Sequence, residues 1–256
     1  MLKLKDKNLS WGKKLYIYSE IFVMVWFISW YILFIFMPAI YEHKTTNHKL
    51  SIYINTDMNQ SKISKILAQT NNILEKHHIN QDMLDADIFL VNDDVFYYID
   101  MLPFMQYFMY GTDAYTLINT VYFKQVNVNK NSVYANFNRT EPIPFTIVLS
   151  HELTHVWQND EYGFIQNFLC SEWIKEGYAV YVSEEIKALK GKKNFLLWIK
   201  VNNEEKITLH DKYILWGLMV KHAIEKMHKS VDDLHLGKVE YDEVLDSLLK
   251  EYNITK

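Results

Sequence analysis

The longest apolar stretch lies near the N-terminus, where residues 21–40 read IFVMVWFISWYILFIFMPAI and carry no charge. A helix of twenty residues is about 30 Å long, which matches the hydrocarbon core of a bilayer. The stretch therefore predicts a transmembrane signal anchor over residues 15–41, preceded by a basic tail over residues 1–14. A cleaved signal peptide is the alternative, although its apolar region is usually only about 7–15 residues long.

The charges beside this stretch predict its orientation. The tail contains five lysines and one aspartate, whereas Lys44 and Lys49 are the lysines that closely follow the apolar run. Lysine-rich flanks tend to stay in the cytoplasm. The sequence thus predicts a single-pass membrane protein with a cytoplasmic N-terminus and an extracytoplasmic domain over residues 42–256. Cleavage of a signal peptide would instead release that domain as a secreted protein.

The remaining pattern predicts strands first and helices second. Short apolar runs with polar ends indicate strands at residues 51–55, 87–91, 116–124 and 132–138. Apolar positions three and four apart indicate a helix over residues 61–77, and the pattern is helical from residue 144 to about residue 252. This order predicts an α+β fold in which the N-terminal helix precedes a mixed-sheet lobe and a helical lobe.

Composition and charge narrow the classes of function. Hydrophobic residues make up 49% of the 256 residues, which is enough to bury a core and excludes a wholly disordered chain. The single cysteine, Cys170, excludes an intramolecular disulfide framework and a cysteine-based zinc cluster. A net charge of −4 argues against a general nucleic-acid binder.

The segment His151-Glu152-Leu153-Thr154-His155 is an HExxH motif. Residues four apart lie on the same face of an α-helix, so His151 and His155 can direct two imidazoles at one metal ion. Glu152 can then reach a water on that ion without ligating the ion itself. The alternative is a pair of surface histidines on an ordinary amphipathic helix, so the motif needs support from its surroundings.

That support comes from the segment SEWIKEGYAVY, which contains Glu176. Twenty residues separate His155 from Glu176, enough for a loop and the start of a second helix. Gly177 and Ala179 are small, and we expect them to let the two helices approach closely around the ion. Two histidines and one glutamate, with a fourth position left for water, form the arrangement of catalytic zinc. The alternative for Glu176 is a solvated charge on a helix.

HELTH followed by WIKEGYAVY resembles the gluzincin metallopeptidases, and the second segment is similar to the third-ligand helix of aminopeptidase N-like enzymes. The resemblance is close over residues 145–188 and implies a zincin-like metallopeptidase domain over residues 42–256. It also implies one Zn²⁺ ion. By the same resemblance, Glu152 is the general base, and the metal ligands are His151, His155 and Glu176.

Two departures from the family pattern limit the resemblance. The sequence has no GxMEN segment, which binds the free amine of the substrate in aminopeptidase N-like enzymes, so aminopeptidase specificity is unsupported. Thermolysin-like enzymes carry an acidic residue four positions after the third ligand, but Val180 stands there. The contact that orients the first histidine must therefore come from another part of the chain.

These observations predict a membrane-anchored zinc endopeptidase that cleaves peptide or protein substrates through a zinc-activated water, with Glu152 as general base. Tyr213 is the first candidate donor to the oxyanion and His210 the second. A strand over residues 132–138 could bind an extended peptide along its edge. Two other functions stay open: a catalytically silent zincin-fold binding module at the membrane, and a membrane-spanning interaction protein in which the HExxH motif is accidental.

Overall fold

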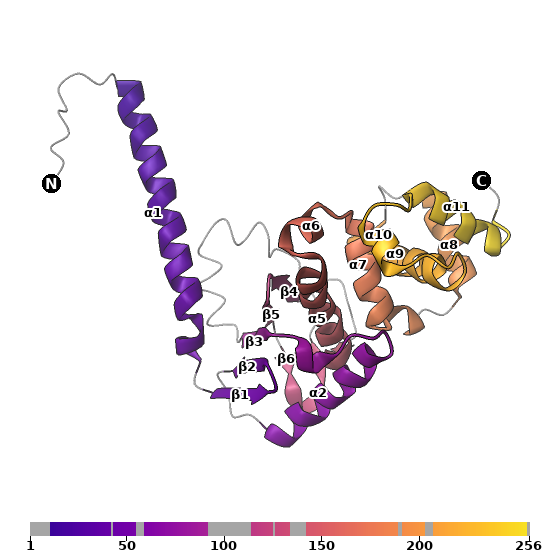
Figure 1. The fold of residues 1–256 in the computed structure, drawn as a ribbon, viewed down its shortest axis with the longest axis horizontal. Coiled ribbons are helices and arrows are strands. Elements are labelled where there is room, and N and C mark those ends of the chain that lie inside the picture. Colours follow the sequence, from indigo (N-terminus) through magenta and orange to yellow (C-terminus); the bar gives the residue numbers. More distant parts are fainter. Residues whose placement is uncertain are drawn as a thin grey trace. The chain divides into compact units, whose positions relative to one another are not determined.

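A computed structural model describes residues 11–41, 43–54, 59–91, 114–124, 126–133, 142–188, 191–202 and 207–254. It shows a mixed α/β arrangement in which most strands precede most helices (Figure 1). The strands are β1 (His43–Asn47), β2 (Leu50–Ile54), β3 (Ala86–Val91), β4 (Ala114–Leu117), β5 (Thr120–Lys124), β6 (Val126–Asn127), β7 (Ser132–Val133) and β8 (Ile143–Pro144). The α-helices are α1 (Trp11–Ile40), α2 (Gln60–Glu75), α5 (Phe145–Tyr162), α6 (Phe164–Leu169), α7 (Glu172–Val182), α8 (Lys192–Asn202), α9 (Leu209–Glu225), α10 (Val231–His235) and α11 (Tyr241–Glu251).

The predicted transmembrane anchor over residues 15–41 is wrong. Among the described residues, no helix combines the length and the apolar character that crossing a membrane requires. Helix α1 covers the apolar run, but its first ten residues include Lys13, Lys14 and Glu20, so the helix is not apolar throughout. The single-pass membrane localisation derived from the anchor is therefore also wrong.

The boundary between the two parts of the chain lies between Glu42 and His43. Residues 43–256 make up one compact unit. A three-stranded sheet, β6-β7-β8, and a five-stranded sheet occur in this unit. The described residues also include three 3₁₀ helices, namely η1 (Gln81–Met83), η2 (Val128–Lys130) and η3 (Glu185–Ala188).

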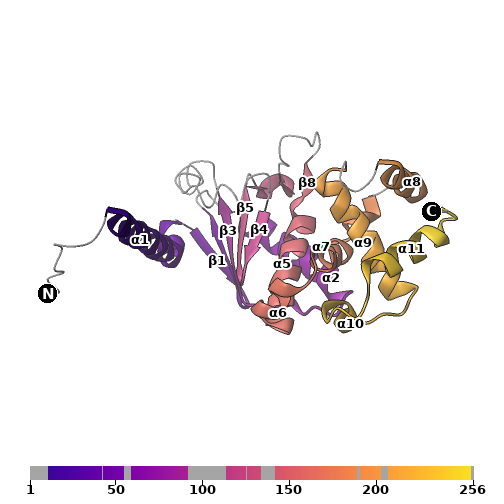
Figure 2. The same ribbon diagram turned by 90° about the horizontal axis from the view of Figure 1, so that it is seen from above.

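The five-stranded sheet has the order β1-β2-β3-β5-β4. Strands β2, β3 and β5 are parallel, and the two edge strands, β1 and β4, are antiparallel to their neighbours (Figure 2). The predicted strand over residues 116–124 is in fact part of a hairpin, because Ile118 adopts a left-handed conformation (φ 58°) between β4 and β5. This turn makes β4 the edge of the sheet that faces α5.

The two faces of this sheet carry different side chains. One face is mainly aliphatic, and residues such as Ile88 share a buried core with α2 and α5. The other face carries Tyr53, Phe89 and Tyr122, one on each parallel strand and in direct register. Their ring centroids lie 4.6 and 5.1 Å apart, so cross-strand stacking fixes the register of the sheet beneath the helices.

Helix α5, which carries the HExxH motif, begins at a cap supplied by the small sheet. Pro144 stands at the N-cap position and gives no side-chain hydrogen bond. Instead the Asn131 backbone oxygen accepts from the Phe145 N–H at 3.0 Å, and the Asn131 Oδ1 accepts from the Thr146 N–H at 3.1 Å. The turn before β7 therefore satisfies the first amides of α5 and fixes where the helix starts.

The predicted strand over residues 132–138 is found only as the two residues of β7, which belongs to the small sheet. Residues 134–138 lie outside the described part of the chain. The peptide-binding edge predicted for this strand thus lies largely outside the described residues.

Helix α7, which carries Glu176, is held by an interlock with α9. A Cβ atom on Gly177 would lie 2.6 Å from the Trp216 carbonyl oxygen and 2.8 Å from the Val220 Cγ2. A Cβ atom on Gly217 of α9 would likewise lie too close to the side chain of Val180 on α7. Gly177 was expected to bring α7 close to the HExxH helix, and this expectation is wrong, because its open side faces α9. The two glycines instead allow α7 and α9 to pack backbone against side chain.

Changing Gly177 to alanine is expected to destabilise the protein by about 1–2 kcal/mol. Alanine gains about 1 kcal/mol in helix propensity, but the new methyl group meets backbone of α9 that cannot rotate away, and overpacking costs about 1–3 kcal/mol or more. Chemical denaturation of the Gly177→Ala variant measures the change. Gly12→Ala in α1 is the matched control, because a Cβ there meets nothing within 4 Å; equal stability of the two variants would contradict the interlock.

Candidate metal centre

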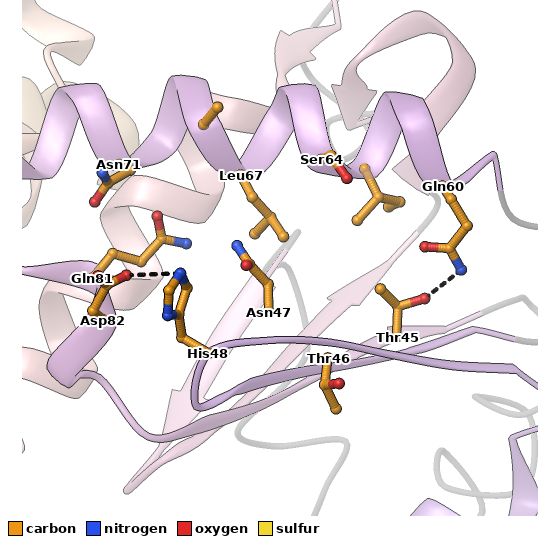
Figure 3. Close-up of a pocket in the computed structure, with 12 residues that line it drawn as sticks. Thr45, Thr46, Asn47, His48, Gln60, Ser64, Leu67, Asn71, Gln81 and Asp82 are labelled. Atoms are coloured by element: carbon orange, nitrogen blue, oxygen red, sulfur yellow. Dashed lines mark hydrogen bonds and ion pairs between the residues drawn. The ribbon is translucent and has the colours of Figure 1, made fainter.

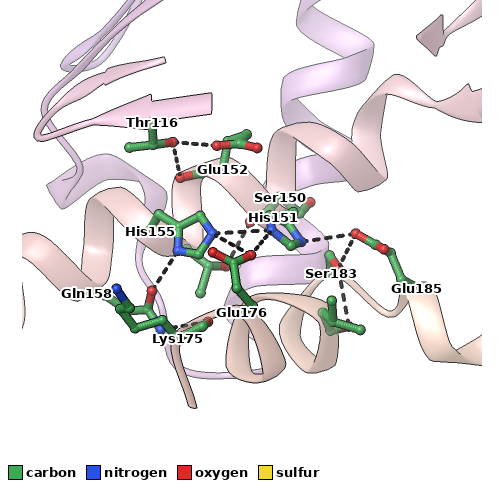
Figure 4. A network of polar contacts seen from close by, with 12 residues as sticks. Thr116, Ser150, His151, Glu152, His155, Gln158, Lys175, Glu176, Ser183 and Glu185 are labelled. Atoms are coloured by element: carbon green, nitrogen blue, oxygen red, sulfur yellow. Dashed lines mark hydrogen bonds and ion pairs between the residues drawn. The ribbon is translucent and has the colours of Figure 1, made fainter. Parts of the chain in front are cut away.

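Two helices bring three potential metal ligands together. The Nε2 atoms of His151 and His155, both on α5, lie 3.2 Å apart (Figure 4). The Oε2 atom of Glu176, from α7, lies 3.3 Å from the first of these nitrogens and 3.5 Å from the second. His151, His155 and Glu176 therefore form a group that could hold a metal ion.

The spacing of the three atoms suits a small divalent ion. Zinc binds imidazole nitrogen and carboxylate oxygen at about 2.0–2.2 Å, which places two ligands of a tetrahedral ion about 3.3–3.6 Å apart. The three observed separations, from 3.2 to 3.5 Å, lie at or near this range. A shared proton could hold the same atoms together, so the direction in which the imidazole lone pairs point also matters.

The hydrogen bonds of Gln158 establish that direction for His155. The Gln158 Nε2 donates to the Lys175 carbonyl oxygen at 3.2 Å, which leaves the Gln158 Oε1 facing the His155 Nδ1 at 2.8 Å. An amide oxygen can only accept, so the Nδ1 atom carries the hydrogen. In the neutral ring the Nε2 atom then presents its lone pair to the ligand group.

A carboxylate fixes the direction of the Nε2 lone pair of His151. The Glu185 Oε1 accepts from the His151 Nδ1 at 3.0 Å, and the Ser183 hydroxyl donates to this oxygen at 3.3 Å. Glu184, two residues after the end of α7, adopts a left-handed conformation (φ 67°). The next residue, Glu185, begins η3 and reaches His151 on α5. Glu185 thus supplies the histidine contact that Val180 cannot make, nine positions after Glu176 and not four.

Removing the Glu185 carboxyl group is expected to weaken metal binding by about 10–100-fold, the range typical of outer partners of histidine ligands. We expect this loss in Glu185→Ala and a smaller one in Glu185→Gln, because an amide oxygen still accepts from the His151 Nδ1. Competition with a chelator of known affinity measures the effect. Glu184→Gln is the control, since that carboxylate pairs with Lys76 at 2.9 Å; an equal loss there would contradict a specific role for Glu185.

Burial and mutual charge shift the pKa values of the whole group. Burial alone would lower the pKa of His151, but hydrogen bonds to Glu176 and Glu185 outweigh it and raise that pKa well above its usual range. Burial opposes the pKa rise of His155 in the same way, and the charge of Glu176 overcomes it. Burial would raise the pKa of Glu176, yet the histidines hold it well below its usual range. The Glu176 carboxylate and the two imidazoles therefore stabilise opposite charges on one another.

Glu152 lies outside this group of ligands, as its predicted role requires. Its side chain is buried and extends toward Thr116 on β4 (Figure 4), where the Thr116 hydroxyl donates to the Glu152 Oε2 at 2.6 Å. Burial raises the pKa of Glu152, and the nearby positive charge of His151 and His155 opposes that rise. Glu152 is thus within electrostatic reach of the ligand group but free to carry a proton.

Tyr213 and His210, the two candidate oxyanion donors, both lie near the start of α9. Tyr213 is half-buried, and burial raises its pKa, with further increases from the charges of Glu176, Glu172 and Glu152. Its phenol therefore shares the electrostatic environment of the ligand group and keeps its proton. His210 is exposed, so Tyr213 is the better supported of the two.

Three residues of this site were not found from the sequence: Thr116, Gln158 and Glu185. Gln158 follows His155 by three positions, a spacing that places both on one helix face and could have revealed it. Thr116 and Glu185 come from a distant strand and from a reversal of the chain, and no local spacing signals either of them.

A separate polar pocket of about 340 Å³ lies between α2 and the β1–β2 hairpin (Figure 3). Amide and hydroxyl groups line much of it, with a hydrogen bond from Gln60 to Thr45 at 2.6 Å and an ion pair between His48 and Asp82 at 3.3 Å. None of the metal-ligand candidates lines this pocket, so it is distinct from the site on α5 and α7.

Comparison with known proteins adds no assignment to this geometry. No model of a protein family matches the chain, and no curated protein matches it either.

Proposed function

We propose that this protein is a zinc-dependent metallopeptidase that hydrolyses internal peptide bonds of peptide or protein substrates. The observation that carries the proposal is the convergence of His151, His155 and Glu176, whose acceptor atoms lie 3.2–3.5 Å apart. Gln158 and Glu185 fix the imidazoles so that their lone pairs face the same point. The resemblance of the two motifs to gluzincins supports the same reaction.

The three ligand residues would hold the zinc ion, and the ion when bound would polarise the scissile carbonyl group and acidify a water molecule. Glu152 takes a proton from the attacking water and delivers it to the leaving amine. Tyr213 donates a hydrogen bond to the oxygen on which negative charge develops. A purely structural metal site needs neither a base nor such a donor, and this supports hydrolysis over a silent binding module.

Strand β4 supports a peptide substrate over a small molecule. Among the described strands it is an edge strand of the five-stranded sheet, and Thr116 connects it to Glu152. An edge strand presents free backbone groups that pair with an extended peptide, which would bring a peptide bond alongside the base.

The test combines metal content with hydrolysis by the purified full chain. We expect about one zinc ion per chain and cleavage of a peptide library that stops on chelation and returns with added zinc. Metal binding without cleavage of any peptide would identify a silent binding module instead. A chain that binds no metal would exclude both readings.

A further inference from the structure

In the described part of the chain, the Glu152 carboxylate has one clear hydrogen-bond partner. The Thr116 hydroxyl donates to the Oε2 atom at 2.6 Å, and the same hydroxyl oxygen lies 3.2 Å from the Glu152 carbonyl oxygen. Glu152 is 6% exposed, so water cannot easily take the place of the Thr116 hydroxyl. A short hydrogen bond between a hydroxyl and a carboxylate is among the stronger ones in proteins.

A second contact holds β4 in place beside α5. The Asn159 Nδ2, two turns further along α5 than Glu152, donates to the Ile118 carbonyl oxygen at 2.9 Å. The Asn167 Nδ2 of α6 donates to the Asn159 Oδ1 at 2.7 Å and thereby orients that amide. The hairpin is therefore attached to α5 at two points, so Thr116 meets Glu152 from a fixed position.

We propose that Thr116 is the positioning residue of the general base in this protein. The inference rests on the proposed function, because it assigns Thr116 a role in the proton transfer by Glu152. Thr116 acts through Glu152 and does not itself touch the reacting atoms.

Thr116 holds one particular oxygen of the Glu152 carboxylate. Thr116 engages Oε2, which fixes the rotation of the carboxylate and leaves Oε1 to accept the proton of the attacking water. Without the hydroxyl, the buried carboxylate would lose this hydrogen bond and turn to find another partner. The base would then spend less time in the reactive orientation, while substrate contacts made elsewhere would persist. Loss of Thr116 should thus lower kcat and leave KM unchanged.

Thr116→Val and Thr116→Ser test this proposal in the full chain. Valine keeps the shape and favours a strand but has no hydroxyl, so we expect kcat to fall about 10-fold with unchanged KM and zinc content. Serine keeps the hydroxyl and should restore kcat to near the wild-type value. Equal kcat for the valine variant and the wild type, or equal losses for valine and serine, would overturn the proposal.

Thr45→Val is the matched control, because Thr45 lies on β1, the opposite edge strand, and accepts from Gln60 at 2.6 Å. Its kcat should stay at the wild-type value. Crystal structures of the two Thr116 variants give a readout that needs no activity. The Glu152 carboxylate should turn in the valine variant and keep its place in the serine variant. A carboxylate unmoved in the valine variant overturns the positioning role, whereas absence of hydrolysis by the wild type overturns the proposed function alone.

Discussion

Replacing Glu152 with glutamine is expected to lower the rate of peptide hydrolysis by about 10²–10⁴-fold, the usual contribution of a positioned acid–base group. Glutamine has nearly the same shape and still accepts from the Thr116 hydroxyl, but it cannot take a proton from water. Since Glu152 does not belong to the ligand group, the zinc content should stay at about one ion per chain. Steady-state hydrolysis of a cleaved peptide together with metal analysis measures both effects.

Glu172→Gln provides the matched control for this change. Glu172 is an exposed carboxylate in the first turn of α7, and its removal alters the local charge by the same amount. We expect the rate of this variant to stay within about twofold of the wild-type rate, since surface substitutions of this kind have small effects. Full activity of Glu152→Gln would show that another group accepts the proton.

Replacing His151 with alanine is expected to remove the bound metal. The variant loses one of three protein ligands and leaves Glu185 without the imidazole to which it is bonded. The loss of affinity should exceed the factor of about 10–100 that follows removal of an outer partner alone. Metal analysis after dialysis should give close to one zinc ion per wild-type chain and almost none per variant chain, with hydrolysis lost in parallel.

His48→Ala separates loss of a ligand from loss of any histidine. His48 pairs with Asp82 at 3.3 Å in the pocket beside α2, away from the ligand group. Zinc content and hydrolysis of this variant should match those of the wild type. Zinc retained in His151→Ala would place the metal at another set of residues.

The part of the site that depends on helical spacing could be predicted from the sequence. Residues four apart on a helix share a face, and the Nε2 atoms of His151 and His155 do lie 3.2 Å apart. Glu176 was found from its own segment, and the structure brings its carboxylate to both imidazoles. A strand over residues 87–91 was also predicted correctly, because a short apolar run between polar ends is a local signal.

The parts that depend on reversals of the chain could not be predicted. The positive φ angle of Ile118 divides an expected strand into β4 and β5, and isoleucine gives no sign of such a turn. The positive φ angle of Glu184 likewise ends α7 and directs Glu185 to His151. The prediction drawn from apolar composition alone was also wrong, because the run over residues 21–40 suggested a membrane anchor that the described helices do not support.

The two imidazoles of the ligand group differ in their outer partners, and this difference makes them unequal electron donors. A carboxylate draws the Nδ1 proton of His151 more strongly than the neutral amide of Gln158 draws that of His155. The His151 ring consequently carries more negative charge and binds a cation more firmly. Substitutions at position 158 would therefore change how much electron density His155 donates to a bound ion. They would adjust the Lewis acidity of that ion while every ligand stays in place.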